Sequence, residues 1–240
     1  KILKFLFVFL PIVFIVYFSL NRFKQYRLAS FSLLIASLYF YAYYNPEYLK
    51  IILSSIAFNY LLSLVLLDKI KINIVSKKFV LVAGLIGNLA LLCFFKYWGF
   101  LTECFNNIAH QHFNAMHLLL PLGISFFTFQ QISYIVDCYK GEAKYSNIID
   151  YALFVTFFPQ LIAGPIVHHK EMIPQFEDES KKVINQNNIS LGFILLTIGL
   201  AKKVLLADAF NPFIDATMAG LGDLDFANSW FLALAIGSQG

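Results

Sequence analysis

The sequence predicts an all-α protein, a polytopic transmembrane helical bundle of about seven to eight spans with broken or re-entrant segments. Two observations support this fold class. Apolar residues make up 59% of the 240 residues and charged residues only 13%, with a mean hydropathy of +0.70. A soluble domain is closer to half apolar and a quarter charged, and it cannot bury this much apolar surface. Long apolar runs also alternate with short polar loops, as in a membrane bundle.

Each expected span is an apolar run of about 18 residues with few charges. The runs are Phe5–Leu20, Leu28–Tyr44, Leu49–Leu67, Phe79–Phe95, Leu118–Val136, Ile148–Val167 and Ile189–Leu206. An eighth run begins near Trp230, and the sequence stops within it at Gly240. We therefore expect one transmembrane domain over residues 1–240 that is incomplete at its carboxyl end.

Basic residues in the loops predict the orientation, because cytoplasmic loops carry an excess of lysine and arginine. The first loop holds Arg22, Lys24 and Arg27, and the third spans Asp68–Lys78 with four lysines, whereas Asn45–Glu47 has none. We place the first and third loops in the cytoplasm of a bacterial cell, with the protein in its inner membrane. Counting spans puts residues 168–188 outside, but their mixed charges do not decide the side. A re-entrant or surface-lying segment would change the side of the membrane on which all later residues lie.

Several function classes lack support. The net charge of +4 comes from basic residues in short loops, so membrane lipid is an expected partner and nucleic acid is not. The three cysteines are widely spaced and suggest neither disulfides nor a zinc site. His110, His112 and His117 have only Glu103 as an acidic neighbour, so we expect no metal. Nucleotide-binding and common hydrolase motifs do not occur.

The fifth run is interrupted by Pro121 and Gly123 and carries Ser125, Gln130 and Gln131. Proline and glycine free backbone polar groups, which then need partners or a water-filled cavity. Glutamines are costly in lipid, so both should face the bundle interior. Two interpretations remain open: a kinked helix with interhelical hydrogen bonds, or the lining of a substrate channel.

The sixth run ends at Gly164 and Pro165, just before His168 and His169. Proline lacks an amide donor and disfavours helix at the residue before it, so we expect the span to end sharply there. The following residues should run along the membrane surface. A histidine could act as a general base, but adjacent histidines on a helix point about 100° apart, so both should not face one site. The alternative is a pair of interfacial histidines.

The seventh run ends in a charged group, Lys202 and Lys203 followed by Asp208. Charges at membrane depth are rare and usually paired or functional. A lysine could reach Asp208 along a helix, or both lysines could extend to the membrane surface. The residues that we consider as channel-lining candidates are Pro121, Gly123, Ser125, Gln130, Gln131, Gly164, Pro165, His168, Lys202, Lys203 and Asp208.

Three blocks of the sequence are together specific enough to indicate a family. They are PLGISFFTFQQISYIVDCYKGE, FFPQLIAGPIVHHKEMIPQF and GLAKKVLLAD, in this order between Pro121 and Asp208. The set resembles the membrane-bound O-acyltransferases, and in particular the bacterial branch that acetylates alginate and peptidoglycan. Residues 1–111 resemble this family only in hydropathy and in an aromatic run at residues 38–44.

The resemblance implies O-acetylation of an exported polysaccharide or of peptidoglycan. The acyl donor would be a cytoplasmic substrate such as acetyl-CoA or an acyl carrier, with no bound cofactor, and the acceptor would be a glycan, reached with a periplasmic acetyltransferase partner. The family's catalytic histidine lies in a Trp/Arg-rich segment, which we expect beyond Gly240. No histidine of this chain matches it, so the chain alone should be inactive. The alternatives are a transporter of polysaccharide or lipid-linked sugar, since broken spans also fit one, and a non-catalytic membrane scaffold.

Overall fold

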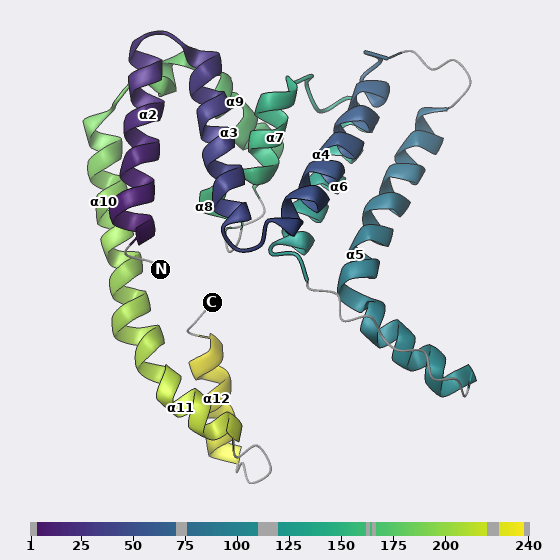
Figure 1. The fold of residues 1–240 in the computed structure, drawn as a ribbon, viewed down its shortest axis with the longest axis vertical. Helices are drawn as coiled ribbons and strands as arrows, with labels where there is room; N and C mark the ends of the chain where they lie inside the picture. The colour runs from purple at the N-terminus through teal and green to yellow at the C-terminus, as the bar shows by residue number, and fades with distance from the viewer. Residues whose placement is uncertain are drawn as a thin grey trace. The chain divides into compact units, whose positions relative to one another are not determined.

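The structure is a computed structural model of the chain. It describes residues 4–70, 76–109, 120–161, 164, 167–219 and 226–237. These residues form helices and loops with no strand among them, which confirms the all-α class. The chain forms two compact units, Lys1–Val183 and Ile184–Gly240, and each is described by itself (Figure 1). The single domain over residues 1–240 stays a prediction.

The first unit contains long helices followed by a series of short ones. Its elements are η1 (Phe5–Phe9), α2 (Leu10–Arg22), α3 (Tyr26–Ala42), α4 (Glu47–Leu66), α5 (Lys77–Ala109), α6 (Ile124–Lys140), α7 (Ile148–Thr156), α8 (Phe158–Leu161), α9 (His169–Glu177) and η2 (Glu179–Lys182).

Four helical segments in the described residues are long and apolar enough to cross a membrane: Phe5–Arg22, Glu47–Leu66, Lys77–Ile108 and Gln186–Met218. Helices α3 and α6 have 17 residues each, which is at the lower limit of about 17–25 residues for a span. The protein is therefore a multi-pass membrane protein. The predicted span Ile148–Val167 is wrong, because the helix that begins there ends at Thr156.

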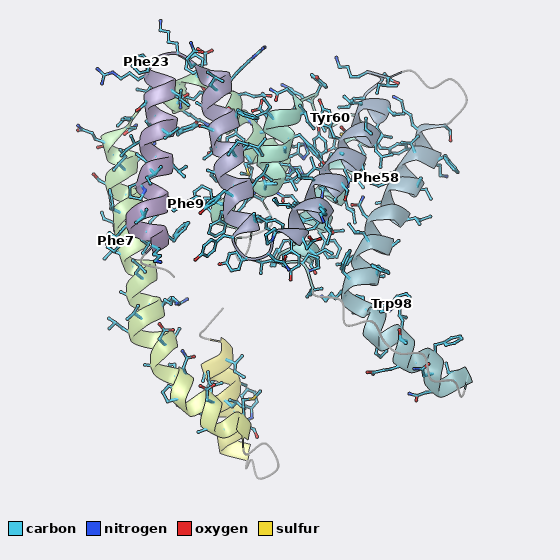
Figure 2. The ribbon with its side chains drawn as sticks, in the orientation of Figure 1. Phe7, Phe9, Phe23, Phe58, Tyr60 and Trp98 are labelled. Atoms are coloured by element: carbon cyan, nitrogen blue, oxygen red, sulfur yellow. The ribbon has the colours of Figure 1, made fainter. Side chains whose placement is uncertain are left out.

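Aromatic rings pack between the helices of this unit. Phe9 packs edge to face on Phe158 with ring centroids 5.2 Å apart, and Tyr134 lies 4.9 Å from Tyr151. Phe9 points towards α3, whereas Phe7 points away and is 73% exposed (Figure 2). An outward phenylalanine is expected where lipid replaces water.

Helices α4 and α5 are joined by a closed pair of buried amides. Asn59 Nδ2 donates to Asn88 Oδ1 at 3.0 Å, and Asn88 Nδ2 donates to Asn59 Oδ1 at 2.7 Å. Each amide also donates to a backbone carbonyl four residues earlier in its own helix, Ser55 O and Gly84 O. The pair is therefore fully satisfied, which makes two buried amides tolerable in an apolar bundle.

The loops at one end of the first unit contact one another and are basic. Lys69, after α4, lies 4.9 Å above the ring of Tyr145, which is in the α6–α7 loop. Lys182 lies 5.1 Å above Tyr26 at the start of α3, at the end that carries the α2–α3 connection in Figure 1.

Residues 168–182 therefore lie at the same end as the first and third loops. The counting rule put them on the other side, and it fails because α7 and α8 enter the bundle while α9 lies again at the end where α7 begins. Lys170, after that segment, binds Glu142, before it, at 2.6 Å. The segment is re-entrant, the alternative that the mixed charges had left open.

The second unit is a long helix followed by a shorter one. Its elements are α10 (Gln186–Ala201), η3 (Lys202–Ala207), α11 (Asp208–Ala219) and α12 (Phe226–Gly237). The side chain of Asn185 caps α10 by accepting from the backbone amides of Asn187 and Asn188. Phe210 on α11 packs on Phe231 on α12, with centroids 6.1 Å apart. No side chain of α10 is buried in this structure, so its apolar surface is available to lipid or protein.

Candidate functional site

A buried polar network joins three helices in the middle of the first unit. Gln131 Nε2 on α6 donates to Ser55 Oγ on α4 at 2.9 Å. The hydroxyl of Tyr151 on α7 donates to Gln131 Oε1 at 3.2 Å. Gln131 is 0% exposed, so it faces the interior as predicted. The network fixes the re-entrant helix α7 against two of its neighbours.

The break after α7 leaves backbone groups that side chains satisfy. Thr156 is the last residue of α7, and Phe157 (φ −53°, ψ 110°) leaves the helical region. Phe154 O accepts from Gln130 Nε2 at 3.1 Å and from Gln160 Nε2 at 3.2 Å. In return, the backbone amide of Phe158 lies 3.4 Å from its acceptor Ser37 Oγ. Such partners are required because an unpaired peptide group inside a membrane costs several kcal/mol.

The turn before α6 contacts the end of this break. Gly123 has φ +71°, and a Cβ added to it would lie 2.6 Å from the backbone oxygen of Leu161, the last residue of α8. Tyr41 donates its hydroxyl proton to Leu122 O at 2.9 Å. Pro121 is buried and Ser125 is half-buried. The two motifs predicted to break spans are therefore in contact with each other.

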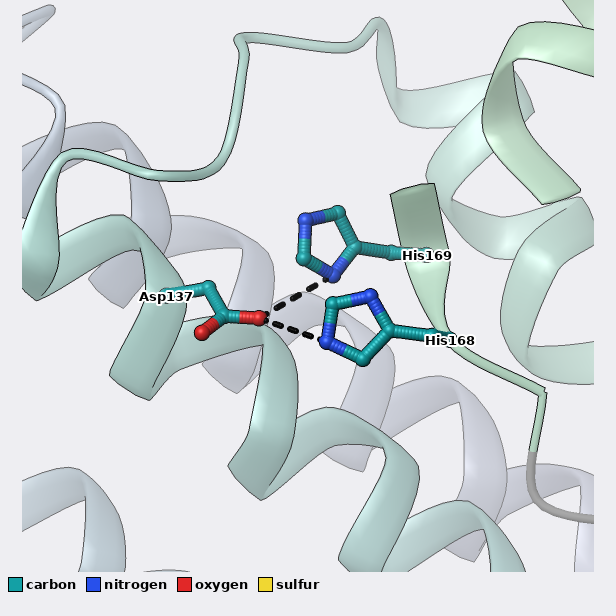
Figure 3. A group of neighbouring side chains, drawn as sticks. All are labelled: Asp137, His168 and His169. Carbon is teal, nitrogen blue, oxygen red and sulfur yellow. Dashed lines mark ion pairs between the residues drawn. The ribbon is translucent and has the colours of Figure 1, made fainter. Parts of the chain in front are cut away.

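A second polar group lies at the basic end, where Asp137 on α6 meets His168 and His169 (Figure 3). Asp137 Oδ2 is 2.9 Å from His168 Nε2 and 3.5 Å from His169 Nδ1. The expectation that adjacent histidines cannot face one site is wrong. His168 is the N-cap of α9 with extended angles (φ −76°, ψ 141°), so the 100° helical rotation does not apply to it.

This cluster contains unsatisfied polar atoms. Asp137 Oδ2 and both ring nitrogens of His169 are buried with no hydrogen-bond partner in the described part of the chain. The ring of His169 packs on Tyr134 at 5.2 Å. Burial lowers the pKa of His169 to about 4, and His168 adds to the shift, so this imidazole is neutral at pH 7. Beside it, the Lys170 ammonium lowers the pKa of the exposed Glu142 carboxyl.

The remaining predicted residues lie apart from these groups. Gly164 follows α8, and a Cβ there would meet Gln160 at 2.6 Å. In the second unit, Lys202 and Lys203 begin a π-helical turn, and Lys203 Nζ is 3.9 Å from Asp208 Oδ2 with both side chains nearly half exposed. Pro165, His110, His112 and His117 lie outside the described residues.

Comparison with known proteins decides the family. A model of the membrane-bound O-acyltransferase family matches residues 138–237. The peptidoglycan O-acetyltransferase of Helicobacter pylori is 41% identical to the chain and matches 98% of it. Residues 138–237 of the chain therefore form a domain of the membrane-bound O-acyltransferase family.

Further relatives of the chain have a second acceptor in their names. A probable alginate O-acetylase of Pseudomonas aeruginosa is 35% identical, and one of Azotobacter vinelandii is 33% identical, each over 98% of the chain. The chain spans about half the length of these curated relatives, 49% of the Helicobacter protein and 44% and 46% of the two acetylases. No solved structure matches the chain.

Sequence reasoning missed several residues of these groups, among them Ser55, Tyr151 and Gln160. The clearest missed signal was Asp137, an acidic residue directly after the apolar run Leu118–Val136. It lies seven residues after Gln130, a spacing that puts both on one face of a helix. Its partners, His168 and His169, could not be found in this way. They lie on a different helix, and only the fold of the segment between them and Asp137 brings them together.

Proposed function

We propose that the protein containing this chain is a membrane O-acetyltransferase that modifies hydroxyl groups of an exported glycan. The observation that carries the proposal is the 41% identity, along 98% of the chain, to a protein named peptidoglycan O-acetyltransferase. The alginate O-acetylases are less similar, at 33–35% in the two relatives described above. Peptidoglycan is therefore the acceptor we favour, and an alginate-like polysaccharide is the second candidate.

The geometry supports transfer across a membrane. The re-entrant segment and the Pro121–Gly123 turn bring backbone breaks from two segments into contact inside the bundle, and non-helical backbone at membrane depth is usual where a protein lines a path for substrate. We propose that Gln130 and Gln131 hold this break in shape. As positioning residues they need not touch the substrate themselves.

The basic end of the first unit supports a cytoplasmic donor side. Lysines gather in the loops after α4 and α6 and around α9, which predicts that this end faces the cytoplasm of a bacterial inner membrane. An anionic acyl donor, such as acetyl-CoA or an acyl carrier, would approach such a face favourably. The glycan acceptor and a periplasmic acetyltransferase partner would then lie on the opposite side. The catalytic histidine stays a prediction for the sequence after Gly240.

The test is deletion of the complete gene in the organism that carries it, followed by mass spectrometry of its cell-wall fragments. We expect loss of O-acetylated muropeptides with an unchanged amount of peptidoglycan, and recovery when the complete gene is restored. Loss of exported glycan with normal acetylation of the remainder would instead indicate the transporter. Normal acetylation and normal glycan in the deletion strain would refute the proposal.

A scaffold is distinguished by the complete protein itself. Purified in detergent or liposomes with radiolabelled acetyl-CoA, an acetyltransferase transfers label to itself or to a glycan acceptor, whereas a scaffold does not. A variant of the histidine that the resemblance places beyond Gly240 is the matched control, and it should lose transfer while keeping its yield and helical content.

A further inference from the structure

The strongest group that acyl transfer does not explain is the cluster of Asp137, His168 and His169. One ligand atom from each residue lies within 4.8 Å of the others. Asp137 is 7% exposed and His169 is 5% exposed. A buried carboxylate oxygen and a buried imidazole without hydrogen bonds cost free energy, so their arrangement calls for a partner.

A simple ion pair does not satisfy the cluster. Asp137 Oδ2 is 2.9 Å from His168 Nε2, but among the described residues it has no hydrogen-bond partner. His169 Nδ1 is 3.5 Å from the same oxygen and is also without a partner. One atom of each residue can therefore supply a lone pair to a metal ion, and the three atoms lie within 4.8 Å of one another.

Two of the three ligand-atom spacings are close to those of a metal site, and the third is within 4.8 Å. Tetrahedral coordination with bonds of about 2.0–2.1 Å places ligand atoms about 3.3 Å apart, and the two contacts of Asp137 Oδ2, at 2.9 Å and 3.5 Å, lie on either side of this value. Two imidazole nitrogens and one carboxylate oxygen are a ligand set used for Zn²⁺ and for Fe²⁺.

We propose that Asp137, His168 and His169 bind a divalent first-row transition-metal ion, with Zn²⁺ as the best match. The ion fastens the start of α9 to the last turns of α6, and so closes the re-entrant segment at its return. Three protein ligands leave a fourth position for water or another small ligand. The side chain of His168 is 39% exposed, which gives the ion a route from solvent.

Two neighbouring contacts of Lys170 could oppose metal binding at this site, and both effects are small. Lys170 is next to the ligands, but its ammonium is 2.6 Å from Glu142, so its charge is largely balanced. One contact is lost: His168 Nδ1 accepts from the Lys170 backbone amide at 3.4 Å, and coordination through Nε2 moves the ring proton to Nδ1. That contact is long, so its loss is small beside two metal bonds to formerly unsatisfied atoms.

Metal analysis of the complete protein tests the proposal without reference to activity. The protein is purified without a histidine tag, stripped with a chelator, equilibrated with Zn²⁺ and freed of excess metal. We expect about one Zn²⁺ per chain by elemental analysis, and much less in an Asp137→Asn/His169→Gln double variant. Equal metal in the wild type and the double variant would overturn the assignment.

Single variants locate the ion. His169→Gln and Asp137→Asn should each weaken Zn²⁺ binding by more than about 100-fold, since even partners of ligands change affinity by about 10–100-fold. The matched control is His112→Gln, which removes a histidine from the His110-Gln111-His112 sequence and should leave affinity unchanged. A loss confined to His112→Gln would overturn the proposal.

A spectroscopic measurement keeps the test decisive if a variant fails to fold. Co²⁺ in place of Zn²⁺ in the wild-type protein should give the intense visible bands of a four-coordinate site with nitrogen and oxygen ligands. The weak spectrum of an octahedral, solvent-like Co²⁺ ion would refute the site. Hydrogen exchange adds a second readout: Zn²⁺ should slow exchange in residues 169–177 of the wild type, and unchanged exchange there would contradict the fastening of α9.

Discussion

Replacing Gly123 with alanine tests whether the turn before α6 must contact the end of α8. Gly123 and Gly141 have nearly the same backbone angles, with φ of +71° and +75°. An alanine at either position pays about 1–2 kcal/mol for the left-handed conformation. The surroundings differ, because a Cβ at Gly123 would lie 2.6 Å from Leu161 O, whereas a Cβ at Gly141 has nothing within 4 Å. Gly141→Ala is therefore the matched control.

The difference in unfolding free energy between the two variants measures the cost of the contact between residue 123 and Leu161 O. Relieving the contact requires the turn or the backbone of α8 to move, because a carbonyl cannot rotate away as a side chain does. Overpacking of this kind costs about 1–3 kcal/mol. We expect Gly123→Ala to lower the free energy of unfolding by about 2–5 kcal/mol, and Gly141→Ala by about 1–2 kcal/mol.

The assay is unfolding of the purified complete protein in mixed micelles with increasing SDS, followed by circular dichroism. Asparagine refines the comparison, since it tolerates the left-handed region better than alanine. Gly141→Asn should be nearly neutral, whereas Gly123→Asn should stay destabilised by the contact with Leu161. Equal losses for Gly123→Ala and Gly141→Ala would refute the reasoning, and the turn would then not press on α8.

Three further predictions follow from the structure. In a double-mutant cycle, Asn59→Leu and Asn88→Leu should each lower the free energy of unfolding by about 1–3 kcal/mol, and the double variant should lose less than their sum because neither amide is left unpaired; simple additivity would contradict the pairing. Cysteine at Lys24 and cysteine at Lys170 should both resist a membrane-impermeant thiol reagent in intact cells and both react after lysis, because the re-entrant segment returns; opposite labelling of the two would refute the topology. Gly164→Leu should lower acetylation by the complete enzyme far more than its yield, because its Cβ would meet Gln160 at 2.6 Å; equal loss of both would show a folding role only.

Composition and hydropathy were sufficient for the fold class and for most helices. Burying apolar side chains away from water is favourable wherever they lie along the chain, so a run of 17–20 apolar residues indicates a helix without knowledge of its neighbours. The inward orientation of Gln130 and Gln131 followed for the same reason, since lipid cannot bond an amide. Three sequence blocks also indicated the family, which the comparisons then showed.

The position of the break depended on tertiary contacts. The sequence placed it at Gly164 and Pro165, where local backbone preferences are strongest. The helix ends earlier, at Thr156, because Gln130, Gln160 and Ser37 supply hydrogen bonds to the backbone groups that the break sets free. A break in an apolar helix is possible only where such partners exist, and here they lie on α6, α8 and α3.

The meeting of Asp137 with His168 and His169 also depended on the tertiary structure. The sequence alone determined a multi-span bundle, its interior glutamines and its family, because each of these depends on the affinity of a segment for lipid or on a local motif. The position of α9 at the basic end, and with it the histidine–carboxylate cluster, was decided by packing between α6, α7 and α9. Local periodicity carries no information on contacts between residues about thirty positions apart, because the chain's path between them is set by the free energy of the whole bundle.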